Sequence, residues 1–290
     1  VCVVIPGEAN AQTRDPLRKI NPPKSNPFPQ NIPPQFPSQT STPPKPDKIA
    51  PMQSNSKKNP GSWIPNPESS PSSSYILNPN SYKWIFFDND GILVNTEPLY
   101  MRASREILND AGIDLSEQQF IDISLTRGES VFQLAESKYS ADEIKLMRDM
   151  RNARYSELLQ SEPIWIDGVE DCLKILSAQF KLAIITSSRR DHFELIHART
   201  GFLKYFDFVI TREDFAKSKP APDAYLAGLK KANIRAEQAV VIEDSARGVA
   251  AAANASIDVI AIPTDLNRNS DFDRAKKIIS NLGQLAQSLT

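Results

Sequence analysis

Cysteine and histidine are scarce in this chain of 290 residues, which contains two of each. Two cysteines are too few for a disulfide framework or a cysteine zinc site. The two histidines, His192 and His197, are five positions apart, so on a helix they do not share a face as i, i+4 metal ligands would. Zinc enzymes and histidine-based catalytic triads are therefore excluded.

Long hydrophobic runs and a strong charge of either sign are also missing. Nowhere do 18 apolar residues follow one another, so the sequence predicts no membrane-spanning helix. The formal net charge of -1 divides into +4 for residues 1–80 (eight basic, four acidic) and -5 for the rest (26 basic, 31 acidic). Because a mildly acidic domain binds nucleic acid poorly, we expect neither a nucleic acid nor a membrane as partner.

Proline is concentrated at one end of the chain, where residues 1–80 hold 18 of the 23 prolines. Such a composition cannot bury enough apolar surface to offset its ordering entropy, so this part is predicted to be a disordered Pro/Ser-rich tail or linker. The opening Val1 to Ile5 and the Ala9 to Ala11 triplet match the end of a truncated secretory signal, although an arbitrary fragment end explains them equally well. We expect a cytoplasmic protein, or an exported or organellar one if that stub is a targeting signal.

From Trp84 onward, short apolar runs alternate with amphipathic segments. The predicted buried strands are Trp84–Phe87, Leu182–Ile185, Phe208–Ile210, Ala239–Ile242 and Val259–Ile262. Helical sequence separates each strand from the next, and this alternation predicts an α/β fold with a doubly wound, Rossmann-like parallel sheet.

One interval, residues 99–163, breaks the alternation because it shows helical patterns and no strand. Two of its helices open with capping-box pairs, Ser116 with Gln119 and Ser140 with Glu143. We expect a small α-helical cap domain here, inserted into a core made of residues 81–98 and 164–290. The insertion follows the first strand's carboxyl end, where open α/β sheets bind ligands.

The first strand ends in two acids, Asp88 and Asp90, followed by Gly91. Both carboxylates can face the crevice at the strand end, and glycine permits a sharp turn there. Because burying two carboxylates without a partner is costly, a cation is expected nearby. The alternative is an Asp-rich turn in solvent.

Polar residues also follow the later strands. Thr186 and Ser187 offer hydroxyl and N–H groups to a phosphate oxygen, although such residues often only cap a helix. Lys219 is followed by Pro220 and Pro222, which restrict the backbone around it, although most lysines are solvated. Glu243 and Asp244 repeat the case for a hard cation bound by oxygen atoms.

Together these elements resemble the haloacid dehalogenase (HAD) superfamily, and in detail its β-phosphoglucomutase-like phosphatase and phosphomutase subfamily. The resemblance covers about residues 82–288, including the inserted helices as the family's cap. The matching segments are Phe86 to Glu97, Thr186 to Ser188, Lys219 to Asp223 and Ile242 to Gly248. All four stand in the family's order and at its spacing.

The resemblance implies an enzyme in which Asp88 is the nucleophile that forms an aspartyl-phosphate. It implies Asp90 as the general acid and then the general base. Mg²⁺ would be held by Asp88, Glu243, Asp244 and the backbone carbonyl of Asp90. Mg²⁺ is accordingly the expected cofactor.

The remaining implied roles concern the substrate. Thr186, Ser187 and Lys219 would bind the phosphoryl oxygens. Candidate substrate contacts on the cap are Tyr100, Arg127 and Arg151. Arg151 has an alternative role, an ion pair with the neighbouring Asp149.

Two positions depart from the family pattern. Asn95 stands where the family usually has aspartate, and either residue can cap the following helix. Tyr100 stands where the subfamily's mutases carry histidine, and a tyrosine is a poor substitute for a proton-relaying histidine.

The expected function is that of a monomeric, Mg²⁺-dependent phosphatase acting on a small phosphorylated metabolite such as a sugar phosphate. A phosphomutase shares every core residue and is the alternative. A non-catalytic binding module recruited through the tail is a third possibility, which six retained polar site residues argue against.

Overall fold

The structure is a computed structural model that describes residues 81–289. The predicted tail of residues 1–80, with its targeting-signal stub, lies outside the described residues. Between Ser81 and Leu289, no helix is long and apolar enough to cross a membrane.

Six parallel strands form one sheet in the order β3-β2-β1-β4-β5-β6. The strands are β1 (Trp84–Phe87), β2 (Lys181–Ile185), β3 (Phe208–Ile210), β4 (Ala239–Glu243), β5 (Asp258–Ala261) and β6 (Lys277–Ile278). The chain builds outward from β1 to β3, then returns to lay β4 on the other side of β1. The reversal makes the β1–β4 boundary a topological switch point, where such sheets bind ligands. The doubly wound prediction is confirmed.

The five predicted strands agree with the structure to within one residue at each end. The sixth, β6, was not predicted because it has only two residues, both exposed. Nothing apolar marks such a strand in the sequence.

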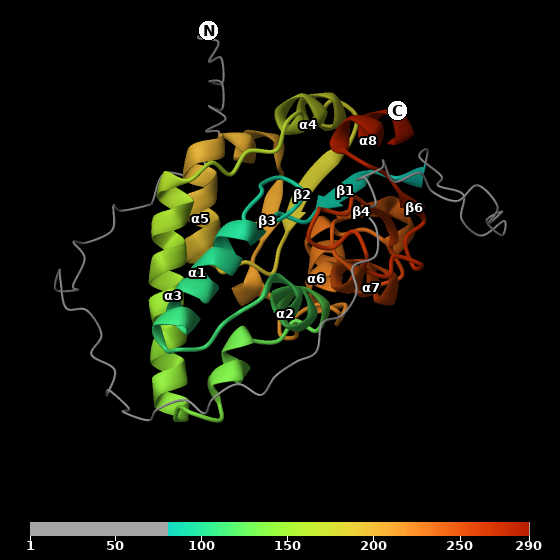
Figure 1. The fold of residues 1–290 in the computed structure, drawn as a ribbon. Helices are drawn as coiled ribbons and strands as arrows, with labels where there is room; N and C mark the ends of the chain where they lie inside the picture. The colour runs from blue at the N-terminus through green and yellow to red at the C-terminus, as the bar shows by residue number, and fades with distance from the viewer. Residues whose placement is uncertain (1–80, 290) are drawn as a thin grey trace, which may run out of the picture. The chain divides into compact units, whose positions relative to one another are not determined.

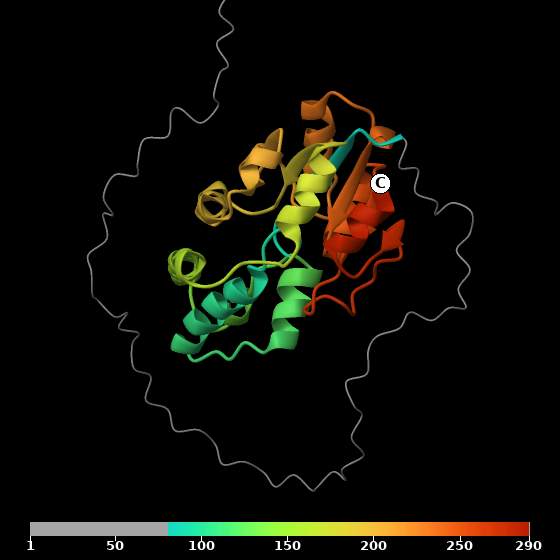
Figure 2. The same cartoon turned by 90° about the horizontal axis from the view of Figure 1, so that it is seen from above.

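Eight α-helices accompany the sheet in the described part of the chain (Figures 1 and 2). They are α1 (Glu97–Asp110), α2 (Glu117–Phe120), α3 (Ala141–Ser161), α4 (Val169–Ser177), α5 (Arg190–Thr200), α6 (Asp223–Ala232), α7 (Ala246–Asn254) and α8 (Leu282–Leu289).

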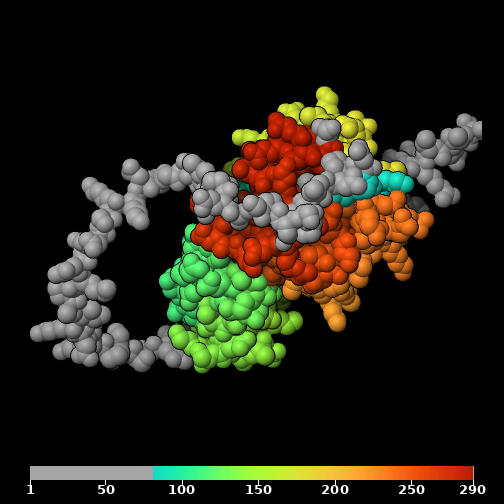
Figure 3. All heavy atoms as spheres, turned by 90° about the vertical axis from the view of Figure 1, so that its right-hand side faces the viewer, coloured from blue at the N-terminus to red at the C-terminus, as the bar shows by residue number. Residues whose placement is uncertain are grey.

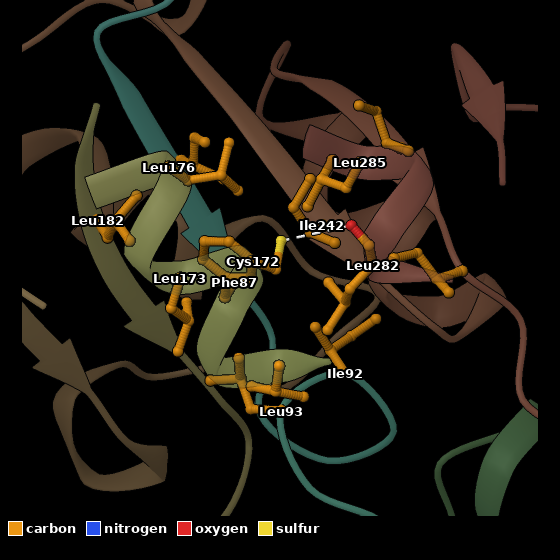
Figure 4. Close-up of a cluster of buried hydrophobic side chains, with 14 of the residues drawn as sticks. Phe87, Ile92, Leu93, Cys172, Leu173, Leu176, Leu182, Ile242, Leu282 and Leu285 are labelled. Atoms are coloured by element: carbon orange, nitrogen blue, oxygen red, sulfur yellow. Dashed lines mark hydrogen bonds between the residues drawn. The ribbon is translucent and has the colours of Figure 1, made fainter. Parts of the chain in front are cut away.

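Helices cover both faces of the sheet because the side chains of each strand point alternately to opposite faces. Ile85 and Phe87 of β1 pack in one cluster with α4, α5 and α8. Trp84 and Phe86 belong to a second cluster with α6 and α7. Figure 4 shows the first cluster, in which the buried Cys172 thiol donates to a backbone carbonyl of α8. Two sealed faces leave the strand ends as the place for polar side chains.

Residues 99–163, the helical interval between β1 and α4, contain no strand, as predicted. Besides α1, α2 and α3 it has a π-helical segment, Ile121–Thr126, and a 3₁₀ helix, Val131–Ala135. The capping boxes at the starts of α2 and α3 are both present. In Figure 3 the green atoms of this interval abut orange and red atoms, which belong to the C-terminal part of the chain.

The two chain segments that enter and leave this interval are hydrogen-bonded to each other. Val94 and Trp165 form an antiparallel bridge, and the Asn95 N–H donates to the Ile164 carbonyl over 2.9 Å. The expectation that Asn95 caps the following helix is wrong. Thr96 is the N-cap of α1. Its hydroxyl donates to the Asp90 carboxylate and makes no capping bond with the helix.

Candidate active site

The predicted site begins where β1 ends, between β2 and β4. Phe87 is in register with Ile184 of β2 and Ile242 of β4, so the residues after these strands emerge at one edge of the sheet. The N–H of Asp88 donates to the Ile242 carbonyl over 2.9 Å. This bond extends the ladder by one residue and positions Asp88 at that edge.

Lys219 links the ends of β1 and β4. Its Nζ lies 2.6 Å from Asp88 Oδ1 and 2.6 Å from Glu243 Oε1, and all three side chains are buried. Burial lowers the pKa of Lys219, but the Asp88 and Glu243 charges outweigh burial and raise it above its ordinary value. The lysine is therefore charged and neutralises two acids at once. The sequence alternative of a solvated Lys219 is wrong.

Glu243 uses both carboxylate oxygens within the protein. Oε1 accepts from Lys219 and, over 2.7 Å, from the Tyr225 hydroxyl. Oε2 accepts from the N–H groups of Asp244 and Ser245 and from the Ser245 hydroxyl at 3.1–3.2 Å. Burial raises the pKa of Glu243, yet Lys219 and these donors lower it below the usual value. Glu243 is thus an ionised anchor for Lys219.

Asp244 is buried beside Glu243, and its Oδ2 accepts from Asn267 Nδ2 over 2.8 Å. Burial raises the pKa of Asp244 well above the usual value, and the nearby Glu97 charge adds to the effect. Asp244 therefore has less compensation from cations than Glu243 has.

Two glycines let the backbone approach these acids. At Gly91, with φ of +81°, a Cβ atom would overlap Oδ2 of Asp244, and at Gly248 a Cβ would overlap the Glu243 carboxylate. Both positions belong to the motifs recognised in the sequence. The role of these glycines is to admit a carboxylate at van der Waals distance from the chain.

Asp88, Glu243 and Asp244 can each present an oxygen so that the three atoms lie within 4.8 Å of one another. Burial raises the pKa of Asp88 to about 7, with Lys219 opposing and Glu243 adding to the shift. Buried oxygen donors with surplus negative charge fit a hard divalent cation such as Mg²⁺. The Asp90 side chain is not part of this group.

The Asp90 carboxylate is held by hydroxyl groups from two directions. Thr96 donates to Oδ1 and Ser188 to Oδ2, and Thr186 also donates to Oδ2 over 3.5 Å. The predicted phosphate ligand Thr186 thus touches Asp90. The Ser187 hydroxyl is buried without a partner among the described residues, which leaves it free to donate to a ligand.

Asn89, between the two acids, is tied to α5. The ring of His197 lies 2.8 Å from Asn89 Oδ1 through Nε2 and 2.9 Å from the Thr200 hydroxyl through Nδ1. Burial lowers the pKa of His197 to about 4, although the Asp90 charge opposes the shift. A neutral His197 donates from Nε2 to Asn89 and supports the loop between the acids. Sequence reasoning missed this contact because the residues are 108 positions apart.

Glu97, the first residue of α1, also faces the acidic group and was given no role from the sequence. Burial raises its pKa to about 8, and the Asp90 and Asp88 charges add to the shift. Its Oε2 atom is buried and has no hydrogen-bond partner in residues 81–289. The quoted motif contained Glu97, but motif membership does not reveal its orientation.

Arg247 connects the core with the helical interval and was likewise missed. Its Nε donates to the Leu125 carbonyl over 2.8 Å, and Nη1 donates to the Lys219 carbonyl over 3.3 Å. Gly128, with φ of +72°, lies so close that a Cβ there would overlap the guanidinium. The signal available in the sequence was the glycine in Thr126-Arg127-Gly128.

Of the three predicted cap contacts, Tyr100 and Arg151 lie together. The Arg151 guanidinium carbon stands 4.2 Å from the centre of the Tyr100 ring. The suggested pairing of Arg151 with Asp149 is wrong, because Asp149 lies 3.8 Å from Lys145 and points away from the buried face of α3.

Arg127 is separate from that pair. It is 48% exposed and pairs with Glu129 over 2.8 Å. The structure therefore does not bring Arg127 together with Tyr100 and Arg151.

Comparison with known proteins supports the interpretation of the motifs. The family model for haloacid dehalogenase-like hydrolases matches residues 85–262. A phosphorylated carbohydrates phosphatase from Thermotoga maritima is 33% identical over 183 residues, which is 61% of this chain and 82% of that protein. Fructose-1-phosphate phosphatase YqaB from Escherichia coli K12 is 29% identical over 187 residues, 62% of this chain and 96% of that protein.

Solved structures show the same fold. CbbY from Rhodobacter sphaeroides, crystallised with phosphate, superposes with a TM-score of 0.63 at 24% identity, covering 70% of this chain and 96% of that one. The narrower β-phosphoglucomutase-like assignment stays a prediction. The motifs, the sheet order and the matched family model together establish that the chain belongs to the haloacid dehalogenase-like hydrolase family.

Proposed function

We propose that the protein is a Mg²⁺-dependent phosphatase that hydrolyses a small phosphorylated metabolite through an aspartyl-phosphate. The observation that carries the proposal is the buried Asp88, ion-paired to Lys219 beside further carboxylates at the switch point of the sheet. The names of the Thermotoga and Escherichia relatives support a carbohydrate phosphate as the substrate class.

In this mechanism Asp88 is the nucleophile. Lys219 holds Oδ1 of Asp88, so Oδ2 is the oxygen proposed to attack phosphorus. Attack breaks the bond between phosphorus and the ester oxygen and transfers the phosphoryl group to the carboxylate. Water then attacks the phosphorus of the aspartyl-phosphate, which restores Asp88 and releases phosphate.

Asp90 is proposed to move the protons. It protonates the leaving alcohol in the first step and takes a proton from water in the second. The hydroxyls of Thr96 and Ser188 hold its two oxygens, one each, so the carboxyl group keeps one orientation through both steps.

Three groups are proposed to bind the phosphoryl oxygens. Lys219 supplies positive charge, and the hydroxyls of Thr186 and Ser187 supply hydrogen bonds. The backbone N–H of Thr186 already donates to the Ile210 carbonyl over 3.0 Å, and its hydroxyl, which donates to Asp90 over 3.5 Å, would turn from Asp90 to the phosphoryl group. The Ser187 hydroxyl has no hydrogen-bond partner among the described residues, so a bond to a phosphoryl oxygen would replace no existing one.

Mg²⁺ would be held by Asp88 and Asp244, with Glu243 and the Asp90 backbone carbonyl completing the protein ligands. When bound, the ion offsets the negative charge that the substrate phosphate brings to this acidic site. Glu243 already accepts from Lys219 and four further groups through its two oxygens, so its main role within the protein is to keep Lys219 in place.

Residues 99–163 are proposed to form the cap over a core of residues 81–98 and 164–290. The paired crossing segments at Val94 and Trp165 support this division. Tyr100, Arg151 and the exposed Arg127 remain the proposed substrate contacts of the cap.

The stacking of Tyr100 favours the phosphatase over the alternative phosphomutase. Its ring packs against Arg151 and, at 5.2 Å between centroids, against Tyr155. A mutase is expected to have a proton-relaying group here, and a stacked tyrosine is a poor one. The monomeric state and the cytoplasmic location stay predictions.

The test is phosphate release by the purified full chain from p-nitrophenyl phosphate and from a panel of phosphorylated sugars and small metabolites. We expect turnover with Mg²⁺, none in EDTA, and recovery when Mg²⁺ is added back. Mass spectrometry of acid-quenched reactions should find the phosphoryl group on Asp88. Full activity in EDTA, or an isomerised sugar phosphate formed in place of free phosphate, would overturn the proposal.

A further inference from the structure

Arg151 is a buried cation without an acidic partner. Among the lysines and arginines of residues 81–289, only Lys219 and Arg151 are buried, at 6% and 8% exposure. Lys219 pairs with two carboxylates. No carboxylate of residues 81–289 lies within 4.0 Å of Arg151. Because burying an unpaired charge is costly, the absence of a counter-ion needs an explanation.

Neutral groups hold the Arg151 guanidinium in place. It lies over the rings of Tyr100 and Phe132, with 4.2 and 5.5 Å from the guanidinium carbon to the ring centres. Its Nε donates to Asn152 Oδ1 over 3.0 Å, and Nη1 donates to the Ser104 hydroxyl over 3.4 Å. Aromatic faces and amide oxygens orient a guanidinium but leave its full positive charge uncancelled.

A chain of contacts joins this cation to Asp90. The Thr96 hydroxyl donates to Asp90, and the Tyr155 hydroxyl is hydrogen-bonded to Thr96. The Tyr155 ring packs edge-on against Tyr100, which lies under Arg151.

Arg151 precedes Tyr155 by four residues on α3, a rise of about 6 Å along the helix. The cation is therefore connected to Asp90 through Thr96, Tyr155 and Tyr100. Lys219 is not part of this chain of contacts, because it pairs with Asp88 and Glu243.

We propose that Arg151 binds a second anionic group of the substrate, a carboxylate or a second phosphate, at the end away from the phosphoryl group that is transferred. A guanidinium presents parallel N–H donors that match either group. The inference rests on the proposed function and narrows its substrate class to phosphorylated metabolites with two anionic ends.

The experiment compares two matched substrate pairs with the purified full chain and Mg²⁺. Glycerol 3-phosphate and 3-phosphoglycerate differ by a carboxylate, and fructose 1-phosphate and fructose 1,6-bisphosphate differ by a phosphate. We expect kcat/KM to be about tenfold or more higher for the second member of at least one pair, mainly through KM. The pair that shows the preference identifies the anion.

Three variants assign the preference. Arg151→Met should remove it, and Arg151→Lys should restore part of it because the charge returns without the two-pronged geometry. Arg154→Met is the matched control on the same helix, since Arg154 already pairs with Glu106 over 2.6 Å. It should leave the preference unchanged.

Calorimetry on the inactive Asp88→Asn variant, with and without Arg151→Met, measures the affinities for the same four compounds. It therefore tests the preference in the absence of turnover. Equal weakening of both members of each pair by Arg151→Met would show a purely structural role and overturn the inference. Turnover without any preference would also overturn it while leaving the proposed function intact. An Arg151-dependent binding preference in a protein that hydrolyses nothing would support the inference and refute the phosphatase.

Discussion

The two buried cations of the described structure are kept in opposite ways. At the sheet edge, Lys219 lies between two carboxylates that cancel its charge. In the helical interval, Arg151 lies against two aromatic rings that orient it without cancelling anything. The sheet edge is a site with surplus negative charge, and the interior of the interval is a site with surplus positive charge. A molecule with a metal-associated phosphate at one end and an anion at the other would satisfy both.

The largest expected effect comes from removing the negative charge at the sheet edge. Asp88→Asn should reduce the rate of phosphate release to below about a hundredth, because the amide keeps the shape but is not a nucleophile. The measurement is turnover of p-nitrophenyl phosphate at saturating Mg²⁺, with the melting temperature as the folding control. A variant with more than that residual rate would remove Asp88 from the nucleophile role.

Removing the positive charge of Lys219 should lower both the rate of phosphate release and the stability of the fold. Lys219→Met leaves Asp88 and Glu243 buried without a counter-ion, which is expected to lower the free energy of unfolding by about 3–5 kcal/mol and activity by roughly 10²-fold or more. Lys204→Met is the control, since Lys204 pairs with Glu170 at the surface and such pairs contribute below about 1 kcal/mol. Urea titrations in EDTA and in Mg²⁺ measure both variants. Equal stability losses in the two would contradict the assignment of Lys219 as a buried counter-ion.

The surplus negative charge should also appear as a pH dependence of stability. Burial raises the pKa of Asp88 from 3.8 to about 7 and that of Glu97 from 4.5 to about 8. Because the folded state holds these protons more tightly than the unfolded state, stability is highest below pH 4 for these groups and is lost as pH rises through 7 and 8. In EDTA, the free energy of unfolding should fall between pH 7 and 9 by on the order of 1 kcal/mol.

The chosen pH window avoids the histidines. Burial lowers the pKa of His192, and lowers that of His197 to about 4, so these groups act in the opposite direction and mainly below pH 6.5. Saturating Mg²⁺ should flatten the slope, since the cation displaces the protons. A free energy of unfolding that rises from pH 7 to 9 in EDTA would contradict the raised pKa values of Asp88 and Glu97.

The smallest expected effect concerns the contact between the two regions. Gly128→Ala adds a Cβ against Arg247, whereas Gly112→Ala adds one at a similar φ, +67° against +72°, with nothing within 4 Å. Both variants carry the backbone strain of about 1–2 kcal/mol. Only Gly128→Ala should also change KM, by about threefold or more, because it displaces the Arg247 contact to Leu125. Identical kinetics in the two variants would show that this contact does not influence the site.

The two regions also differ in how far the sequence predicts them. Asp88 follows β1, Glu243 ends β4, and Lys219 stands directly before Pro220. Parallel strands bring their carboxyl ends to one edge whatever lies between them. For that reason local motifs were enough to predict the fold, the strand bounds and the members of the acidic group. The assignment of a metal to that group and the role of each residue stay predictions.

Contacts between helices could not be predicted in the same way. The stack of Tyr100, Arg151 and Tyr155 depends on the angle at which α1 and α3 cross, and no local pattern specifies that angle. The His197 contact with Asn89 depends on where α5 packs against the sheet. The exposed Arg127 shows the same limit, because a motif position did not reveal that its side chain pairs with Glu129 at the surface.

The hydrogen-bonded crossing at Asn95 and Ile164 restricts how the helical interval can move. A domain connected by one peptide segment can rotate about any axis. Two connecting segments that are hydrogen-bonded to each other act as a hinge that bends in one direction and resists twisting. If residues 99–163 move, the Val94–Trp165 bridge and the Asn95–Ile164 hydrogen bond make that crossing the expected hinge. Opening about that hinge would separate the Leu125 carbonyl from Arg247, and closing would restore the hydrogen bond and with it the alignment of the two charged regions.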